Sequence, residues 1–231
     1  MSIAQNIAHI QECVAAAARR SGRKPEEISL MAVSKTVAPE KIREAYDGGL
    51  RLFGESRLQE LAAKTIPLHD LKYIEWHMIG HLQANKVAKA AELFGAVDSL
   101  DSLRLADKLN EAAELAGKKM AILIEINIGG EAAKSGLAPA SSELLSLLDA
   151  AKRLRYLEFR GLMTVPPFTE DPEGARPYFR SMRELCEKIE GARWPNVSMD
   201  VLSMGMSHDF EVAIEEGSTH VRIGTAIFGA R

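Results

Sequence analysis

Eight short apolar runs alternate with amphipathic segments along the chain, and this alternation restricts the possible folds more than any other feature. The apolar residues of the intervening segments recur at helical spacing. This pattern is typical of repeated βαβ units and of a parallel sheet. The expected strands are residues 29–34, 51–54, 75–78, 96–99, 120–127, 158–163, 199–202 and 219–223.

Helix start and stop signals divide the segments between these strands. An opening helix is expected over residues 3–20, and Gly217 is suited to end the helix before the eighth strand. A capping side chain or an early proline favours the start of a helix. Such starts are Pro39, Ser102, Ser142 and Asp171-Pro172.

The number of strands favours a closed barrel. Eight strands joined by helices predict an α/β fold of the (β/α)8, TIM-like type with an extra N-terminal helix, and 231 residues suit a fold that typically needs about 250. A doubly wound open sheet is the alternative, but it requires a reversal of strand order that the alternation does not reveal. Because the sequence has no linker or low-complexity tract, one domain is expected over residues 1–231.

Charge and hydropathy argue against nucleic-acid and membrane binding. The formal net charge is −3 and there is no dense run of Lys and Arg, so attraction to nucleic acid has no electrostatic support. No apolar run approaches the about 20 residues of a membrane-spanning helix, and the N-terminus lacks a secretory layout. Cys13 and Cys186 lie outside any metal-ligand spacing. We therefore expect a soluble cytoplasmic protein without a metal.

Lys35 is the first candidate site residue. In barrels of this type the active face lies at the C-terminal ends of the strands, and Lys35 directly follows the apolar run that ends at Val33. A lysine partly removed from water has a lowered pKa and offers the neutral amine that Schiff-base formation requires. Position alone leaves an ordinary surface lysine as an equal alternative.

Two later segments have the composition of an anion site. In the first, Gly205 permits close approach of the backbone, and Ser203 and Ser207 offer hydroxyl groups just before a helix. Gly224-Thr225 offers a second turn, and barrels commonly bind phosphate in the loops after strands seven and eight. The alternative is that Ser207 only caps the helix and Gly224 only turns the chain.

Three further residues have a charged or metal-binding side chain near a strand end. Arg222 lies in the last strand, where it either faces a site or forms an ion pair at the barrel rim. His77 and His81 are four residues apart, but the intervening segment follows a strand and lacks the Glu of a zinc-binding helix. A structural histidine pair is therefore favoured over a zinc site.

Several motifs are shared with a known family. They are Ala32-Val33-Ser34-Lys35-Thr36, Phe53-Gly54-Glu55, Trp76-His77-Met78-Ile79-Gly80 with Leu82-Gln83 and Asn85-Lys86, Asn127 with Glu131, Lys134, Gly136 and Pro139, Gly161-Leu162-Met163, Leu202-Ser203-Met204-Gly205-Met206-Ser207 with Asp209, and Val221-Arg222-Ile223-Gly224 with Phe228-Gly229. Over nearly its whole length the chain thus resembles the pyridoxal phosphate homeostasis protein family.

This resemblance implies a fold-type III barrel for pyridoxal 5′-phosphate, similar to the N-terminal domain of alanine racemase. Lys35 matches the lysine that forms the aldimine with the cofactor. Arg222 matches the arginine facing the pyridine nitrogen, where a cation disfavours ring protonation and weakens the cofactor as an electron sink. The residues matching the phosphate site and its surroundings are Ser207, Gly224 and Thr225, with Met204, Gly205 and Met206 beside them.

One departure from the family concerns the second motif. The family usually reads Phe-Gly-Glu-Asn, whereas this chain has Ser56 followed by Arg57, so a hydrogen bond from Ser56 replaces at most part of what the Asn provides. Lys134 lies in the loop after the fifth strand, where it either assists cofactor handling or is a solvated lysine.

The resemblance implies a carrier rather than an enzyme, with pyridoxal phosphate and the apoenzymes that receive it as partners. Related racemases add a second, β-rich domain that completes the site, whereas this chain ends at Arg231, soon after strand eight. An open cofactor suits exchange better than stereocontrolled proton transfer. No catalytic residue is therefore expected, although weak racemase-type activity remains compatible with the sequence. The oligomeric state is left open between a monomer and a weak dimer.

Two alternatives use the same lysine. An amino-acid racemase would need a base other than Lys35, and none of the four tyrosines falls in a recognisable motif at an expected strand end. A Schiff-base aldolase would use Lys35 and the phosphate loops without the cofactor. Colour separates the aldolase from the carrier and the racemase, because a protein that carries the aldimine is yellow.

Overall fold

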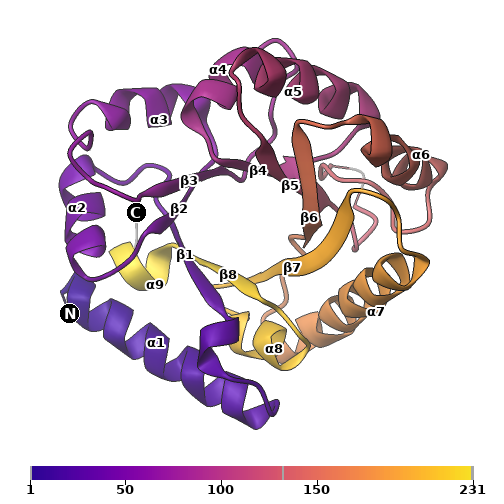
Figure 1. The fold of residues 1–231 in the computed structure, drawn as a ribbon. Coiled ribbons are helices and arrows are strands. Elements are labelled where there is room, and N and C mark those ends of the chain that lie inside the picture. The colour runs from indigo at the N-terminus through magenta and orange to yellow at the C-terminus, as the bar shows by residue number, and fades with distance from the viewer. Residues whose placement is uncertain (1, 132, 230–231) are drawn as a thin grey trace.

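A closed barrel of eight parallel strands forms the centre of the computed structural model, which describes residues 2–131 and 133–229 (Figure 1). Each strand pairs with the next in the sequence, and the last pairs with the first. The strands are β1 (Ser29–Val33), β2 (Leu52–Glu55), β3 (Glu75–Met78), β4 (Ala96–Leu100), β5 (Met120–Glu125), β6 (Leu157–Met163), β7 (Val197–Met206) and β8 (His220–Ile223). The (β/α)8 prediction is confirmed, and the open-sheet alternative is wrong.

Helices surround the barrel and cover its outer face (Figure 1). They are α1 (Ile3–Arg20), α2 (Pro39–Asp47), α3 (Leu58–Thr65), α4 (Val87–Leu93), α5 (Leu103–Leu115), α6 (Ser142–Ala150), α7 (Arg176–Ala192), α8 (Phe210–Glu215) and α9 (Thr225–Phe228). Short 3-10 turns lie at Pro25–Glu27, Ala151–Arg153 and Pro172–Ala175. None of the helices within the described ranges is both long and apolar enough to cross a membrane.

The N-terminal helix α1 is the extra helix expected from the sequence. Ser2 and Gln5 form a capping box at its start, and its buried stripe includes Ile3, Ile7 and Ile10. Burial of each such side chain contributes about 1.5–3 kcal/mol. Asn6 donates a hydrogen bond from Nδ2 to the carbonyl of Ile227 at 2.8 Å. The first helix therefore holds α9, which directly follows the last strand.

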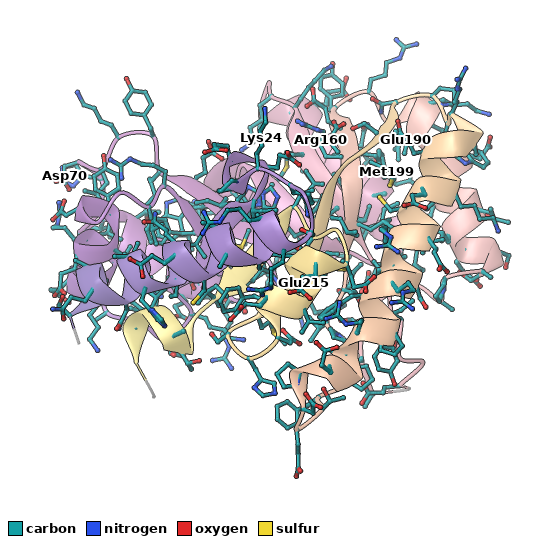
Figure 2. All side chains as sticks on the ribbon, turned by 90° about the horizontal axis from the view of Figure 1, so that it is seen from below. Lys24, Asp70, Arg160, Glu190, Met199 and Glu215 are labelled. Atoms are coloured by element: carbon teal, nitrogen blue, oxygen red, sulfur yellow. The ribbon has the colours of Figure 1, made fainter. Side chains whose placement is uncertain are left out.

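Ion pairs and hydrogen bonds fix the elements around β7. Arg20, at the end of α1, donates to Glu215 of α8 at 2.7 Å; Glu215 is labelled in Figure 2. On the other side, the N–H of Met199 in β7 donates to Glu190 of α7 at 3.0 Å, and the two residues lie together in Figure 2. These contacts fix both β7 and α8. Ser207 lies in the short loop between them.

Several element ends differ from the sequence expectations. Ser141, rather than Ser142, caps α6: its backbone is extended and its hydroxyl accepts the N–H of Leu144, whereas Ser142 is already helical. Asp171 caps a 3-10 turn, and α7 begins only at Arg176. β7 extends to Met206, four residues beyond the expected end, because it continues to pair with β8.

Side chains of each strand alternate between two environments. In β1, Ala32 packs in the hydrophobic core between barrel and helices, whereas Met31 and Val33 are buried outside that cluster and point to the barrel interior. Arg222 of β8 is in register with Met31 and therefore also faces the interior. The guanidinium of Arg222 therefore lies inside the barrel, where side chains of other strands can contact it.

Candidate functional site

Lys35 lies in a tight turn at the C-terminal end of β1. The turn is closed by a hydrogen bond from the N–H of Val37 to the carbonyl of Ser34 at 2.9 Å. Lys35 is half-buried, and Thr36 beside it has a φ of 63°, in the left-handed region. The structure therefore places this lysine on a fixed turn at the barrel mouth, as the sequence predicts.

The loops after β7 and β8 meet next to this turn. Ala32 pairs with Ile223, so Gly224 lies beside Val33, and a Cβ on Gly224 would stand 3.4 Å from the Val33 carbonyl oxygen. The hydroxyl oxygen of Ser207 accepts a hydrogen bond from the N–H of Ala226 at 3.4 Å. The two predicted anion segments therefore come together next to the lysine turn.

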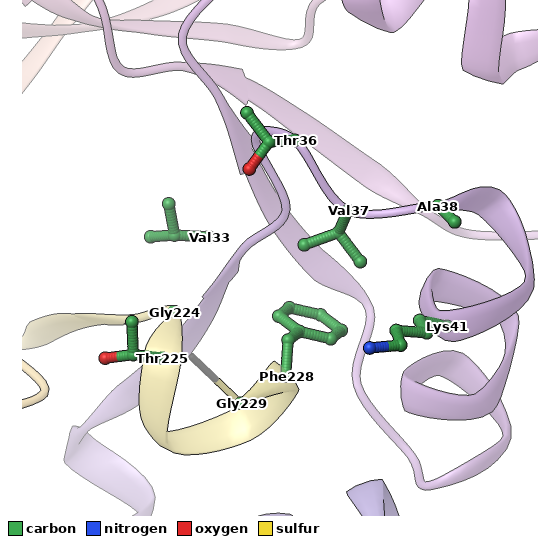
Figure 3. Close-up of a pocket in the computed structure, with 9 residues that line it drawn as sticks. All are labelled: Val33, Thr36, Val37, Ala38, Lys41, Gly224, Thr225, Phe228 and Gly229. Atoms are coloured by element: carbon green, nitrogen blue, oxygen red, sulfur yellow. The ribbon is translucent and has the colours of Figure 1, made fainter. Parts of the chain in front are cut away.

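A pocket of about 360 Å³ lies between the β1 turn and α9 (Figure 3). Thr36 and Val37 line it from the turn, and Gly224 and Thr225 line it from the start of α9. The first N–H groups of a helix have no partner within the helix, so groups at this start are suited to an anion. The predicted residues Gly224 and Thr225 thus belong to one pocket.

Met204, Gly205 and Met206 shape the loop before Ser207. Met204 is fully buried in the hydrophobic core. Gly205 has a φ of 92°, and a Cβ there would stand 2.5 Å from Cβ of Ala213, so only glycine lets the end of β7 pack against α8. The N–H of Met206 donates to Asp209 at 2.7 Å. The observed role of Gly205 is close packing against a helix.

Arg222 lies in the barrel interior and is only 4% exposed. Its guanidinium donates to the hydroxyl of Ser203 and to the carbonyl of Thr164, both at 2.7 Å. No carboxylate of residues 2–131 or 133–229 lies within ion-pairing distance of it, which argues against the rim ion pair. Burial lowers the pKa of Arg222, while the charges of Asp98 and other carboxylates act to raise it.

Two histidines and an aspartate lie deeper in the barrel. Nδ1 of His77 is 3.0 Å from Asp98, whose side chain is fully buried. Burial acts to lower the pKa of His77, but the Asp98 charge outweighs it and the pKa is raised. Burial lowers the pKa of His220 to about 4, and its Nδ1 is buried without a hydrogen-bond partner. A neutral His220 therefore lies near the paired His77.

His81 binds a different carboxylate from His77. Its Nδ1 lies 3.1 Å from Asp101, on the loop after β4. The described parts of the chain contain no group of three or more His, Cys, Asp and Glu side chains that could hold a metal ion. The two histidines act as separate partners of two aspartates.

Lys134 joins the loops after β5 and β6. Its ammonium group donates to the carbonyl of Pro166 at 3.1 Å and pairs with Glu131. In the same region Glu125 accepts the hydroxyl of Ser135 at 2.8 Å, and burial raises the pKa of Glu125. Lys134 is therefore tied to its own loop and to the next one.

Ser56 lies in a second pocket at the barrel mouth. This pocket, of about 330 Å³, is also lined by Arg57, His81 and Lys86. A Cβ on Gly80 would stand 2.5 Å from the Ser56 carbonyl oxygen, so the loops after β2 and β3 are in contact. Ser56 does not line the pocket formed by Gly224 and Thr225.

The sequence assigns no role to Asp98 and places Thr164 only among the residues that follow a strand at the functional face, and it suggests an anion-binding hydroxyl for Ser203 rather than a contact with Arg222. Asp98 carried a visible signal, because it is a charged residue in the middle of a strand whose residues are otherwise apolar or small. The role of Thr164 has no such signal, because its backbone carbonyl is the acceptor. A cross-barrel contact of this kind is visible only in three dimensions.

The chain is similar to known proteins along almost its whole length. A model of the alanine racemase N-terminal domain family matches residues 3–231. The pyridoxal phosphate homeostasis protein of Aquifex aeolicus is 45% identical over 231 residues, covering 100% of this chain and 99% of that protein. The protein of that name from Escherichia coli K12 is 44% identical, covering 99% of this chain and 97% of the relative.

Solved structures show the same fold. PipY of Synechococcus elongatus with pyridoxal phosphate bound has a TM-score of 0.85 at 34% identity, covering 99% of this chain and 100% of PipY. Alanine racemase of Streptomyces coelicolor has a TM-score of 0.70 at 20% identity, covering 97% of this chain and 58% of the racemase. The second likeness shows the barrel fold alone.

Proposed function

The chain belongs to the alanine racemase N-terminal domain family, and within it to the pyridoxal phosphate homeostasis proteins, and we propose that it carries pyridoxal 5′-phosphate and supplies it to apoenzymes. One observation supports this proposal most: the two loops suited to an anion meet beside the turn that bears Lys35. A phosphate group and a reactive aldehyde on one small molecule require an anion site and an amine in this proximity.

The phosphate end of the cofactor fits the start of α9. Ser207 and Thr225 offer hydroxyl groups, and the N–H groups at Gly224 and Thr225 come before the first helical hydrogen bond. Gly224 adds no side chain next to the Val33 carbonyl. We assign the phosphate to Ser207, Gly224 and Thr225. Met204, Gly205 and Met206 shape the loop that presents Ser207.

Lys35 provides the amine. Pyridoxal phosphate supplies an aldehyde that condenses with a primary amine and releases one water molecule. Lys35 is half-buried in the turn that follows β1, at the C-terminal end of the barrel where the loops after β7 and β8 also lie. We assign to Lys35 the covalent attachment of the cofactor.

Arg222 supports the choice of a carrier over an enzyme, if it faces the ring nitrogen as the resemblance implies. Its guanidinium is fixed by Ser203 and Thr164, and arginine keeps its charge at neutral pH. A fixed cation that donates a hydrogen bond to the ring nitrogen disfavours protonation of that nitrogen. Catalysis that draws electrons into the ring would thereby be weakened.

The relatives' names support a role in homeostasis. We place this role in the cytoplasm, and the free thiols of Cys13 and Cys186 agree with a reducing compartment. Ser56 lies in the neighbouring pocket, so we assign it an indirect contribution at the barrel mouth.

Transfer of the cofactor tests the proposal. Protein loaded with pyridoxal phosphate is mixed with an apo-transaminase, and the rate at which transaminase activity recovers is compared with the rate at which the loaded protein releases its cofactor by dissociation alone. Faster recovery with the loaded protein supports delivery, and equal rates contradict it. Purified protein that racemises alanine efficiently would instead support an enzyme.

A further inference from the structure

The turn that bears Lys35 contains a residue in an unfavourable conformation. Lys35 and Thr36 are the two central residues between Ser34 and Val37, and Thr36 has a φ of 63°. The second central position of such a turn usually takes glycine or asparagine, since a β-branched side chain is strained in the left-handed region. Other contacts must therefore hold this turn in place.

Three charged side chains lie behind the turn. Lys64 of α3 donates to Glu55 of β2 at 2.8 Å and to Glu60 of α3 at 2.6 Å. Its ammonium group also donates to the carbonyl of Ser34 at 2.8 Å. The hydroxyl of Ser34 donates to the same oxygen of Glu55 at 2.6 Å. We call Glu55, Glu60 and Lys64 the turn-anchoring cluster.

This cluster contacts the residues on both sides of Lys35. Ser34, which precedes the lysine, is held through its carbonyl and its hydroxyl. Thr36, which follows it, donates its backbone N–H to the carboxylate of Glu60. The peptide groups that set the direction of Lys35 are thus fixed from the outside of the barrel.

The cluster is too deeply buried to be explained by ordinary surface pairing. The side chain of Lys64 is 7% exposed and that of Glu55 is fully buried. Burial raises the pKa of Glu55, and its second carboxyl oxygen has no hydrogen-bond partner. Because the desolvation of buried ions offsets most of their attraction, such pairs stabilise a fold little, and a positional role accounts for them better.

Glu60 remains ionised at the edge of the cluster. Burial acts to raise its pKa, but hydrogen bonds from Lys64 and from the N–H of Thr36 outweigh burial and lower it. A carboxylate accepts a backbone N–H more strongly than a neutral group does. Glu60 is therefore the member of the cluster that acts directly on the strained residue.

We propose that Glu60 and Lys64, supported by Glu55, are positioning residues that hold the strained Ser34–Val37 turn and so aim Lys35 at the cofactor aldehyde. This inference rests on the proposed function, because it assigns a role through the backbone of Ser34 and Thr36, on either side of Lys35. It differs from that function in placing the determinants of Lys35 geometry on α3.

A rescue experiment tests the role of Glu60. Glu60→Ala removes the acceptor of the Thr36 N–H, and we expect the apparent Kd for pyridoxal phosphate to rise about tenfold, as release of one strained residue implies. Adding Thr36→Gly to Glu60→Ala lets the turn form without strain. The double variant should recover to within about threefold of the wild-type Kd, because Gly accepts the left-handed conformation.

Two controls separate positioning from general destabilisation. Glu187→Ala removes the carboxylate of an exposed i,i+4 ion pair with Arg183 on α7, and its Kd should match that of the wild type. Glu60→Gln keeps an oxygen that can accept the Thr36 N–H, so its Kd should lie between those of the wild type and Glu60→Ala. If Glu60→Ala does not fold, Glu60→Gln replaces it in the rescue experiment. Its weaker binding of pyridoxal phosphate should disappear when Thr36→Gly is added.

The outcomes distinguish this inference from the proposed function. A wild-type protein that does not bind pyridoxal phosphate refutes the proposed function. A wild type that binds, with an unchanged Kd in the folded Glu60 variants, overturns the positioning role. Failure of Thr36→Gly to restore binding in a folded double variant overturns it as well, because a purely structural effect of Glu60 would not be relieved by glycine at position 36.

Discussion

The hydroxyl oxygen of Ser207 lies 3.4 Å from the backbone nitrogen of Ala226 and accepts its hydrogen bond. This contact joins the loop after β7 to the first turn of α9, although the two residues are far apart in the sequence. It brings a hydroxyl group to the start of a helix beside the lysine turn, which is the arrangement that a phosphorylated aldehyde requires.

Ser207→Ala tests the phosphate assignment. A hydrogen bond to a charged group contributes about 1.5–3 kcal/mol, so the Kd for pyridoxal phosphate should rise about tenfold or more. Titration of cofactor absorbance measures this change. Binding of pyridoxal, which lacks the phosphate, is the control and should be unchanged; an equal loss for both ligands would contradict the assignment.

Gly205→Ala tests the packing of the same loop. The added Cβ would stand 2.5 Å from Cβ of Ala213, and the φ of 92° is unfavourable for alanine. We expect the free energy of unfolding to fall by about 1–3 kcal/mol, measured by urea denaturation. Gly191 in α7 has nothing within 4 Å of such a Cβ, so Gly191→Ala should stabilise the protein slightly instead.

The barrel and the position of Lys35 could be predicted because they depend on local periodicity. Ala32 and Val33 alternate between the outer core and the interior as any strand requires, and the lysine follows the end of that strand. The partners of Arg222 could not be predicted in this way. Ser203 lies in β7 and Thr164 directly follows β6, and nothing in the spacing of the sequence places them beside the guanidinium.

The exact ends of some helices could not be predicted from the sequence either. Ser141 and Ser142 are equally good caps, and only the backbone conformation selects Ser141. The short helix α9 was read only as a turn at Gly224-Thr225, because four residues carry no periodic pattern. Its position depends on Asn6 at the other end of the chain, which donates to the carbonyl of Ile227.

His220 predicts a pH dependence of stability. Its folded-state pKa of about 4 lies below its ordinary value of 6.5, so the unfolded chain binds a proton more readily between these values. Stability therefore falls as the pH drops from about 6.5 to about 4, by up to about 3 kcal/mol from this residue. Urea denaturation across this range measures the slope.

His220→Gln removes the titrating group and should flatten the slope over that range. His77 has the opposite sign, because its pKa is raised in the folded protein, so its contribution is present at low pH and is lost as the pH rises through its folded value. A slope that is unchanged in His220→Gln would show that His220 is not buried in its neutral form.

Covalent attachment to Lys35 is the central claim, and borohydride trapping tests it most directly. The protein is loaded with pyridoxal phosphate, reduced with sodium borohydride and digested, and the labelled peptide is identified by mass spectrometry. We predict a label on the peptide that contains Lys35 in the wild type, and no label at this stoichiometry in Lys35→Ala. A full-stoichiometry label in Lys35→Ala, or a wild-type label confined to another lysine, would contradict the account.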